Sequence, residues 1–181
     1  MVVIDLTSSD NSLEVAKKYT KRVYSHEHVP VVEQVRAFSL DKCKHDWVLT
    51  IDPDEVVGPA LVKDLEQFID SKQSKKIGVV DVPLLNYFRR KPLMGTFWGS
   101  DTTKPALLHR QRLSIGTGVH ASITLNESFK RHKLKRTANN LLHHYWSPGW
   151  RSLLEKHRRY VKAEGEARYK SGQRFSWPVF L

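Results

Sequence analysis

Hydrophobic residues along this chain alternate between short continuous runs and stretches in which they recur every three or four positions. Runs of this kind predict strands, and the helical spacing predicts amphipathic helices between them. The expected strands are residues 2–4, 22–25, 47–51 and 77–85. The expected helices begin near Asn11, at Pro30, at Pro59 and at Ser147 or Pro148, the last one running to about Lys170.

Strands that alternate with helices of about ten residues predict an α/β fold with a mostly parallel sheet flanked by helices. A chain of 181 residues, 40% of them hydrophobic, can bury a core of one domain plus an appendage. A doubly wound sheet usually begins with a strand and a ligand-binding loop. We therefore expect that a first βα unit is missing before residue 1 and that the abrupt apolar end, residues 177–181, is incomplete.

Charge divides the chain unevenly. Residues 1–128 hold 17 Lys and Arg against 16 Asp and Glu, whereas residues 129–181 hold 13 against 3. We therefore expect a balanced domain over 1–128 and a basic helical C-terminal region over 129–181. Such a region suits phosphate-rich partners or an anionic membrane surface, and a solvated helix face is the alternative.

Two features of the sequence indicate the cellular compartment. The single cysteine, Cys43, cannot form an internal disulfide and suits a reducing compartment. No apolar stretch approaches the roughly 18 residues that span a bilayer. We expect a soluble cytoplasmic chain that associates peripherally with the inner face of the membrane.

Two carboxylates, Asp52 and Asp54, follow the expected strand 47–51 directly. The carboxyl ends of strands face the ligand crevice in open α/β sheets. Hard oxygen donors of this kind suit Mg²⁺ or Mn²⁺, which bridge nucleotide phosphates. Asp-Pro-Asp is also good turn chemistry, and the turn and the metal site are compatible. Glu55 is expected either to support these aspartates or to stabilise the N-terminus of the next helix.

Asp5 ends the first expected strand and can accept hydrogen bonds from a nucleobase or ribose. Asp10, further on, is interpreted as a helix cap.

Another candidate for the site is the glycine-bounded loop with Phe97, Trp98 and Asp101, which suits a sugar ring and a general base. An ordinary core tryptophan is its alternative. His120 is the best histidine candidate for a site, against the structural role that lone histidines usually have.

Two segments resemble family 2 glycosyltransferases. Residues 2–14, Val-Val-Ile-Asp-Leu-Thr-Ser-Ser-Asp-Asn-Ser-Leu-Glu, are similar to the family segment V-V-D-x-x-S-x-D-x-T-x-E. Residues 42–55, Lys-Cys-Lys-His-Asp-Trp-Val-Leu-Thr-Ile-Asp-Pro-Asp-Glu, are similar to K-A-x-G-D-W-V-L-x-L-D-x-D-E. Three further segments resemble short motifs of the family members that make envelope polysaccharides. These are Leu108-His109-Arg110, Val119-His120 and Lys156-His157-Arg158-Arg159-Tyr160.

The resemblance implies a GT-A fold and a metal-dependent, inverting transfer from a nucleotide-sugar to a saccharide or lipid-linked acceptor in cell-envelope glycan synthesis. Asp5 would contact the nucleoside and Arg36 would lie near the nucleotide. Asp52 and Asp54 would hold Mg²⁺ or Mn²⁺ on the diphosphate.

Three departures from the family pattern matter. The opening P-x-Y-N-E loop is absent, Ala37 replaces a common asparagine, and Ala121 stands where V-H-E has its glutamate. The general base is therefore open between Asp101, Glu127 and His120, with Asp101 preferred. A nucleic-acid-binding module is a rival interpretation that leaves the acidic strand ends unexplained, and a degenerate scaffold without catalysis is another.

Overall fold

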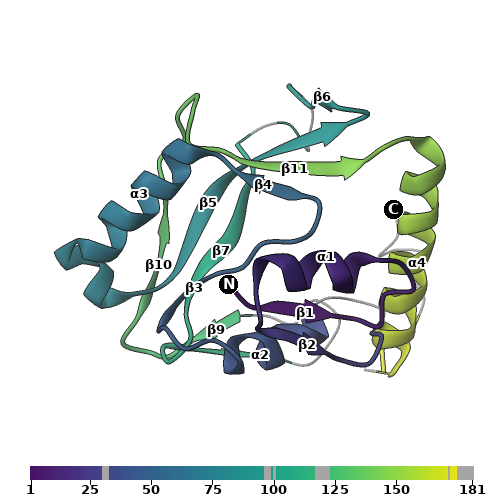
Figure 1. The fold of residues 1–181 in the computed structure, drawn as a ribbon, viewed down its shortest axis with the longest axis horizontal. Coiled ribbons are helices and arrows are strands. Elements are labelled where there is room, and N and C mark those ends of the chain that lie inside the picture. The colour runs from purple at the N-terminus through teal and green to yellow at the C-terminus, as the bar shows by residue number, and fades with distance from the viewer. Residues whose placement is uncertain (30–32, 96–98, 100, 117–122, 171, 175–181) are drawn as a thin grey trace. The chain divides into compact units, whose positions relative to one another are not determined.

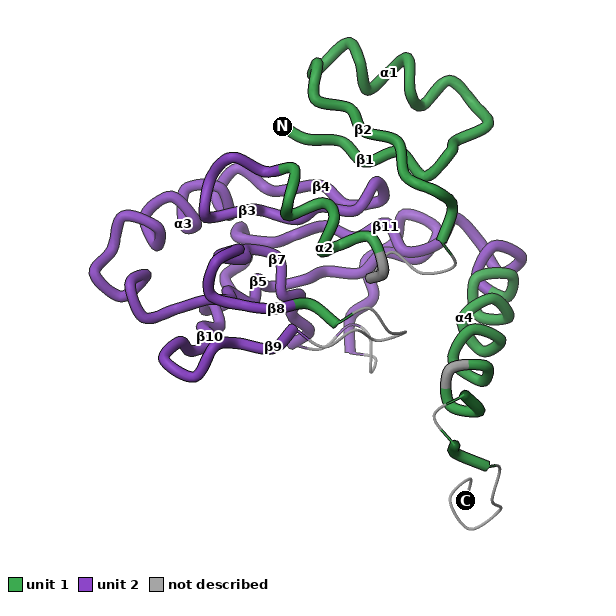
Figure 2. The backbone as a smooth tube through the Cα atoms, turned by 90° about the horizontal axis from the view of Figure 1, so that it is seen from below, with its two compact units in different colours: residues 1–42, 115–122, 154–181 green, residues 43–114, 123–153 purple. Residues whose placement is uncertain are grey.

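The structure, a computed structural model, describes residues 1–29, 33–95, 99, 101–116, 123–170 and 172–174, and it falls into two compact units. Unit 1 comprises residues 1–42, 115–122 and 154–181, and unit 2 comprises residues 43–114 and 123–153 (Figure 2). Each unit is assembled from segments far apart in the sequence, whereas the division expected at residue 128 followed charge alone.

Unit 1 contains a βαβ arrangement at the start of the chain. Its elements are β1 (Val3–Asp5), α1 (Ser12–Tyr19), β2 (Val23–Ser25) and α2 (Glu33–Asp41). Strands β1 and β2 are parallel, with Asp5 opposite Ser25 at their carboxyl ends. The N-cap of α1 is Asn11 and not Asp10, but Asp10 Oδ1 accepts the Ser12 backbone N–H at 3.0 Å and so stabilises the start of the helix from the preceding position.

Unit 2 is built around one large sheet. Its elements are β3 (Trp47–Leu49), β4 (Glu55–Val57), α3 (Pro59–Asp70), the 3₁₀ helix η1 (Lys72–Lys76), β5 (Ile77–Phe88), β6 (Lys91–Pro92), β7 (Thr103–His109), β9 (Ile123–Leu125), β10 (Lys130–Lys133) and β11 (Leu142–Ser147). Strand β8 (Leu113–Ile115) pairs with β9 in a separate two-stranded sheet.

The large sheet has the order β3-β7-β5-β11-β4, and β10 and β6 also pair with β5 (Figure 1). The α/β class is confirmed, but the pairing is mixed rather than mostly parallel. Strand β5 is parallel to β10 and β11, whereas the pairs β3–β7, β5–β7, β5–β6 and β4–β11 are antiparallel. A short connection such as that between β5 and β6 permits only antiparallel pairing, since parallel strands need a long crossover.

The final helix expected from Ser147 or Pro148 to about Lys170 is confirmed as α4 (Trp150–Lys170), and the earlier part of the basic region 129–181 is not helical. Strands β10 and β11 precede α4, and both pair with β5. Leu142 at the start of β11 is fully buried in the core, so this basic stretch contributes to the sheet. Within the described part of the chain, no helix is long and apolar enough to cross a membrane.

The core of unit 2 lies between α3 and the large sheet. Helix α3 presents Leu61, Leu65 and Phe68 at positions i, i+4 and i+7, all of them buried. They pack in one cluster with residues of β5, β7 and β11, including Val80 and Leu142. Figure 1 shows α3 lying along this sheet. The packing fixes the strands that carry the polar side chains described below.

Replacing Leu61 by alanine should lower the free energy of unfolding by about 2–5 kcal/mol, because its side chain is fully buried and the helix cannot collapse into the space it leaves. Urea denaturation followed by circular dichroism measures this change. Val62→Ala, at the neighbouring exposed position on α3, should change it by about 0.5 kcal/mol or less. Equal losses in the two variants would contradict the placement of α3 on the sheet.

Candidate active site

A tight turn, Asp52 to Glu55, connects β3 to β4. The Glu55 N–H donates to the Asp52 carbonyl oxygen at 3.0 Å, and the Asp52 N–H donates to Glu55 Oε2 at 2.8 Å. Pro53 sits at the second position of the turn, where its fixed φ is favourable. The turn therefore exists as the sequence suggested, but β3 ends at Leu49 rather than at Ile51, so the aspartates do not follow the strand directly.

Lys104 on β7 joins the side chains of this turn. Its ammonium lies 2.8 Å from Asp52 Oδ2 and 2.6 Å from Glu55 Oε2. The Glu55 side chain is 1% exposed and that of Lys104 is 13% exposed, whereas Asp52 is 35% exposed. A buried carboxylate requires a charged or hydrogen-bonding partner, which Lys104 supplies. Glu55 therefore supports Asp52 directly, the first of the two roles expected for it.

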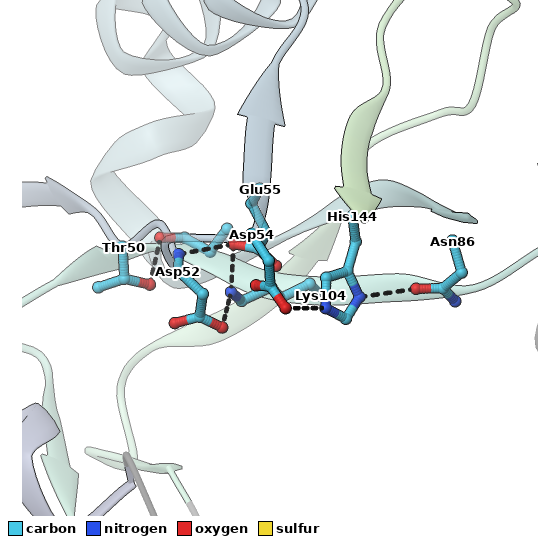
Figure 3. A network of polar contacts seen from close by, with 8 residues as sticks. Thr50, Asp52, Asp54, Glu55, Asn86, Lys104 and His144 are labelled. Atoms are coloured by element: carbon cyan, nitrogen blue, oxygen red, sulfur yellow. Dashed lines mark hydrogen bonds and ion pairs between the residues drawn. The ribbon is translucent and has the colours of Figure 1, made fainter. Parts of the chain in front are cut away.

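His144 on β11 faces the other aspartate of the turn. Its Nε2 lies 3.3 Å from Asp54 Oδ2, and its Nδ1 lies 2.8 Å from Asn86 Oδ1 (Figure 3). Strand register explains the contact, because His144 is paired with Glu55 of β4 on one side and with Asn86 of β5 on the other. The Tyr145 N–H also donates to the Asp54 carbonyl oxygen at 2.8 Å, which ties the turn to β11.

The carboxylates of Asp52 and Asp54 are both partly exposed, and in the view of Figure 3 they point to the same side of the turn. Among the residues that the structure describes, no three His, Cys, Asp or Glu side chains form a group that could hold a metal ion. Mg²⁺ is commonly bound by one or two carboxylates together with waters and substrate phosphates. Two carboxylates alone would therefore need waters or substrate phosphates to complete the coordination of such an ion.

The residues expected to contact the nucleotide lie in unit 1. Asp5 ends β1, and its two carboxylate oxygens each lie 3.3 Å from the Ser8 backbone nitrogen, whose N–H they accept. Its carbonyl oxygen accepts the His26 N–H at 2.8 Å. Arg36 lies on α2 with a half-buried side chain. The structure thus confirms the expected strand end at Asp5, and the nucleotide-binding roles of both residues stay predictions.

The preferred general base, Asp101, is an exposed residue just before β7. Its Oδ2 accepts a hydrogen bond from Lys133 Nζ at 2.7 Å. This hydrogen bond and the charge of Lys133 lower the pKa of Asp101 below its ordinary value of 3.8. The carboxylate is then ionised at neutral pH, as a base must be, but its affinity for a proton is reduced.

The structure says less about the other two candidates for the general base. Glu127 is exposed in the turn between β9 and β10. His120, like Phe97 and Trp98, lies outside the described residues.

One of the resembled envelope elements is buried. Leu108 and His109 are buried on β7, and the His109 ring packs edge-on against Trp47 at 5.0 Å between centroids. Burial and the nearby charge of Arg112 lower the pKa of His109. His109 is therefore a neutral core residue. The other described element, residues 156–160, lies on α4.

Sequence reasoning missed Lys104, Asn86 and His144. Lys104 lies 52 residues from Asp52, and His144 lies 90 residues from Asp54. His144 had one signal in the sequence, its place beside His143 in a short apolar stretch, because neighbouring side chains on a strand point to opposite faces. In the structure these neighbours face different partners, since His143 Nδ1 lies 2.9 Å from the Tyr87 hydroxyl.

Comparison with known proteins identifies a family. Residues 1–157 match the family model described as Glycosyl transferase family 2. Uncharacterized glycosyltransferases of Rickettsia typhi and Rickettsia prowazekii are 23% and 24% identical to this chain, each match covering 97% of the chain and 61% of the relative. A third, from Rickettsia bellii, is 22% identical over 96% of the chain and 60% of its own length.

The chain thus spans about three fifths of the length of the curated relatives it matches. The family match includes the acidic strand end at Asp5 and the Asp52–Glu55 turn, and it extends into α4. On this match over most of its length, the chain belongs to glycosyl transferase family 2.

Proposed function

We propose that this protein transfers a sugar from a nucleotide-sugar donor to a saccharide or lipid-linked acceptor, with inversion at the anomeric carbon, in cell-envelope glycan synthesis. The observation that carries the proposal is the Asp52–Glu55 turn between β3 and β4, which holds two partly exposed carboxylates in a family 2 chain. Such a site suits a donor with a diphosphate leaving group.

Asp52 and Asp54 are proposed to hold Mg²⁺ or Mn²⁺ on the donor diphosphate. When bound, the cation would act as a Lewis acid and neutralise charge that builds on the leaving nucleoside diphosphate. The protein's own part is to hold the two carboxylates in place before the donor arrives. Glu55 and Lys104 do this for Asp52, and His144 contacts Asp54.

The nucleotide itself is assigned to Asp5 and Arg36. A carboxylate accepts hydrogen bonds from a ribose hydroxyl or a nucleobase N–H, and a guanidinium matches the geometry of phosphate oxygens. The support for these assignments is the position of Asp5 at the carboxyl end of β1 and the family resemblance of both residues.

Inversion requires a base that removes a proton from the acceptor hydroxyl while that oxygen attacks the face of the sugar opposite the leaving group. Asp101 is our candidate, and Glu127 and His120 are the alternatives. Asp101 precedes Lys104 by three residues, so its Cα lies within about 11 Å of the Cα of the lysine that contacts Asp52.

A lipid-linked acceptor would bring the protein to an anionic membrane surface, and α4 suits that contact. Leu154 and Val161 are 58% and 69% exposed, and Arg158 lies between them on the same face at positions i, i+4 and i+7. Exposed apolar side chains beside cations are typical of helices that lie in a membrane interface. Further basic residues of this helix are Arg151, Lys156, Arg159 and Lys162.

Asp54→Ala should weaken the binding of Mn²⁺ in the presence of UDP by about tenfold or more, because a carboxylate next to a dication is worth well over 1.4 kcal/mol. Isothermal titration calorimetry measures the affinity, with GDP tested in parallel. Asp70→Ala removes an exposed aspartate from the end of α3 and should bind like wild type. Equal binding by wild type and folded Asp54→Ala would reject the metal site.

Lys133→Met should raise the pKa of Asp101 toward 3.8, because it removes the hydrogen bond and charge that lower it. Carbon-13 NMR titration of the aspartate carboxyl groups measures this pKa. Lys130→Met, an exposed lysine on the same strand, is the matched control. A carboxyl pKa at Asp101 that is the same in all three proteins would contradict the ion pair.

The sign of the matching stability effect follows from the direction of this shift. The folded pKa of Asp101 is lowered, so the pair stabilises the fold above the unfolded pKa, and this contribution is lost as the pH falls through the folded pKa. Lys133→Met should therefore be less stable than wild type at neutral pH, and the difference should shrink as the pH falls below the ordinary aspartate pKa of 3.8.

The chain should float with liposomes that contain anionic lipid and not with neutral liposomes, since each cation near such a surface contributes up to about 1 kcal/mol. Arg158→Glu with Lys162→Glu should reduce flotation strongly. Lys63→Glu with Lys72→Glu changes net charge equally on exposed residues of unit 2 and should reduce it less. Tight, salt-sensitive binding of single-stranded RNA without liposome association would overturn the membrane proposal.

A further inference from the structure

Lys104 occupies the carboxylate to which the proposed metal would bind. Its ammonium lies 2.8 Å from Asp52 Oδ2 and 2.6 Å from Glu55 Oε2, in the network of Figure 3. The backbone of Lys104 belongs to β7, where Lys104 pairs with Val82 of the central strand β5. Lys104 is thus held by the sheet, and a 13% exposed side chain has little freedom to move its charge elsewhere.

The same ammonium fixes the direction of the Asp52 side chain. Glu55 Oε2 accepts both the Asp52 N–H and a hydrogen bond from Lys104 Nζ, while Lys104 also bonds Asp52 Oδ2. Together these contacts fix both the backbone and the carboxylate of Asp52. The fixed side chain is available to a ligand at no further cost in conformational entropy.

The charge of Lys104 has a second consequence for a cation. A dication bound to Asp52 would lie a few ångströms from the ammonium on the same carboxylate, and their repulsion corresponds to about tenfold or more in affinity even at the dielectric constant of water. A diphosphate reverses this balance, because its negative charge attracts both the dication and the ammonium. Lys104 therefore opposes the metal alone and favours the metal together with the diphosphate.

We propose that Lys104 is a positioning residue that orients Asp52 and, through its charge, makes divalent-cation binding at Asp52 and Asp54 depend on the donor diphosphate. This inference rests on the metal site proposed above. It predicts a coupling free energy between cation and nucleotide, which is reciprocal for the two ligands. The competing explanation is that Lys104 only neutralises buried Glu55.

The two explanations predict different changes in Mn²⁺ affinity when the charge of Lys104 is removed. Lys104→Met should bind Mn²⁺ alone about tenfold more tightly than wild type, and its gain in Mn²⁺ affinity on adding UDP should be correspondingly smaller. A lysine that only stabilised the fold would leave Mn²⁺ binding weaker or unchanged when lost. Lys104→Arg retains the charge and should retain the weak binding of Mn²⁺ alone.

Lys104→Met leaves the buried Glu55 carboxylate without its cation, which can destabilise the fold. The double variant Lys104→Met with Glu55→Gln removes both charges, and the amide oxygen of Gln can still accept the Asp52 N–H. This variant should also bind Mn²⁺ alone about tenfold more tightly. Lys130→Met is a control, because it removes one exposed charge from β10 and should leave Mn²⁺ binding unchanged.

Electron paramagnetic resonance of free Mn²⁺, titrated with the full chain with and without UDP, measures both affinities, and circular dichroism checks the fold. Tighter binding of Mn²⁺ alone by the double variant, absent from Lys130→Met, supports the proposal. Unchanged or weaker binding by the folded double variant, with wild-type binding still dependent on Asp54, overturns this inference and leaves the metal site intact. Binding in the presence of UDP that does not depend on Asp54 overturns both.

Discussion

The backbone N–H and C=O groups of the long central strand β5 need hydrogen-bond partners along both edges of the strand. The arrangement of unit 2 follows from that requirement. Its middle residues Val79, Val80 and Val82 are fully inaccessible, so water cannot replace a missing hydrogen bond there. Strand β7 pairs along one edge, while β10 and then β11 pair along the other. Side chains from distant parts of the sequence thus reach the turn after β3, with Lys104 coming from β7 and His144 from β11.

Electrostatic compensation decides the geometry of that turn. Glu55 is buried beside Lys104, and unit charges about 4 Å apart attract by roughly 4 kcal/mol at an effective dielectric constant near 20. Much of this attraction offsets the cost of removing both groups from water. The ion pair therefore contributes mainly to the specificity of the fold, because it can form only when β4 and β7 are correctly placed in the sheet. Asp52 is then oriented as well.

The mixed pairing in the sheet shows that a hydrophobic pattern does not specify strand direction or strand neighbours. The strand expected over residues 77–85 and helices α3 and α4 were predictable, because long apolar or amphipathic stretches depend on local sequence. The strand runs on to Phe88. The direction of each strand and its neighbours were not, because an apolar run fits parallel and antiparallel partners equally. Strand β10, with the sequence Lys-Arg-His-Lys, has no apolar pattern and is a strand only because β5 needs a partner at that edge.

The sequence by itself determined the acidic strand end at Asp5, the turn from Asp52 to Glu55 that follows β3, and the family. These features are local, since a strand, a proline and adjacent carboxylates need no distant contact to be recognised. Only the tertiary structure decided that Lys104 neutralises Asp52 and Glu55 and that His144 meets Asp54. Such contacts join residues 49 to 90 positions apart, and they arise from strand register, which is set by the packing of the whole sheet and not by any local pattern.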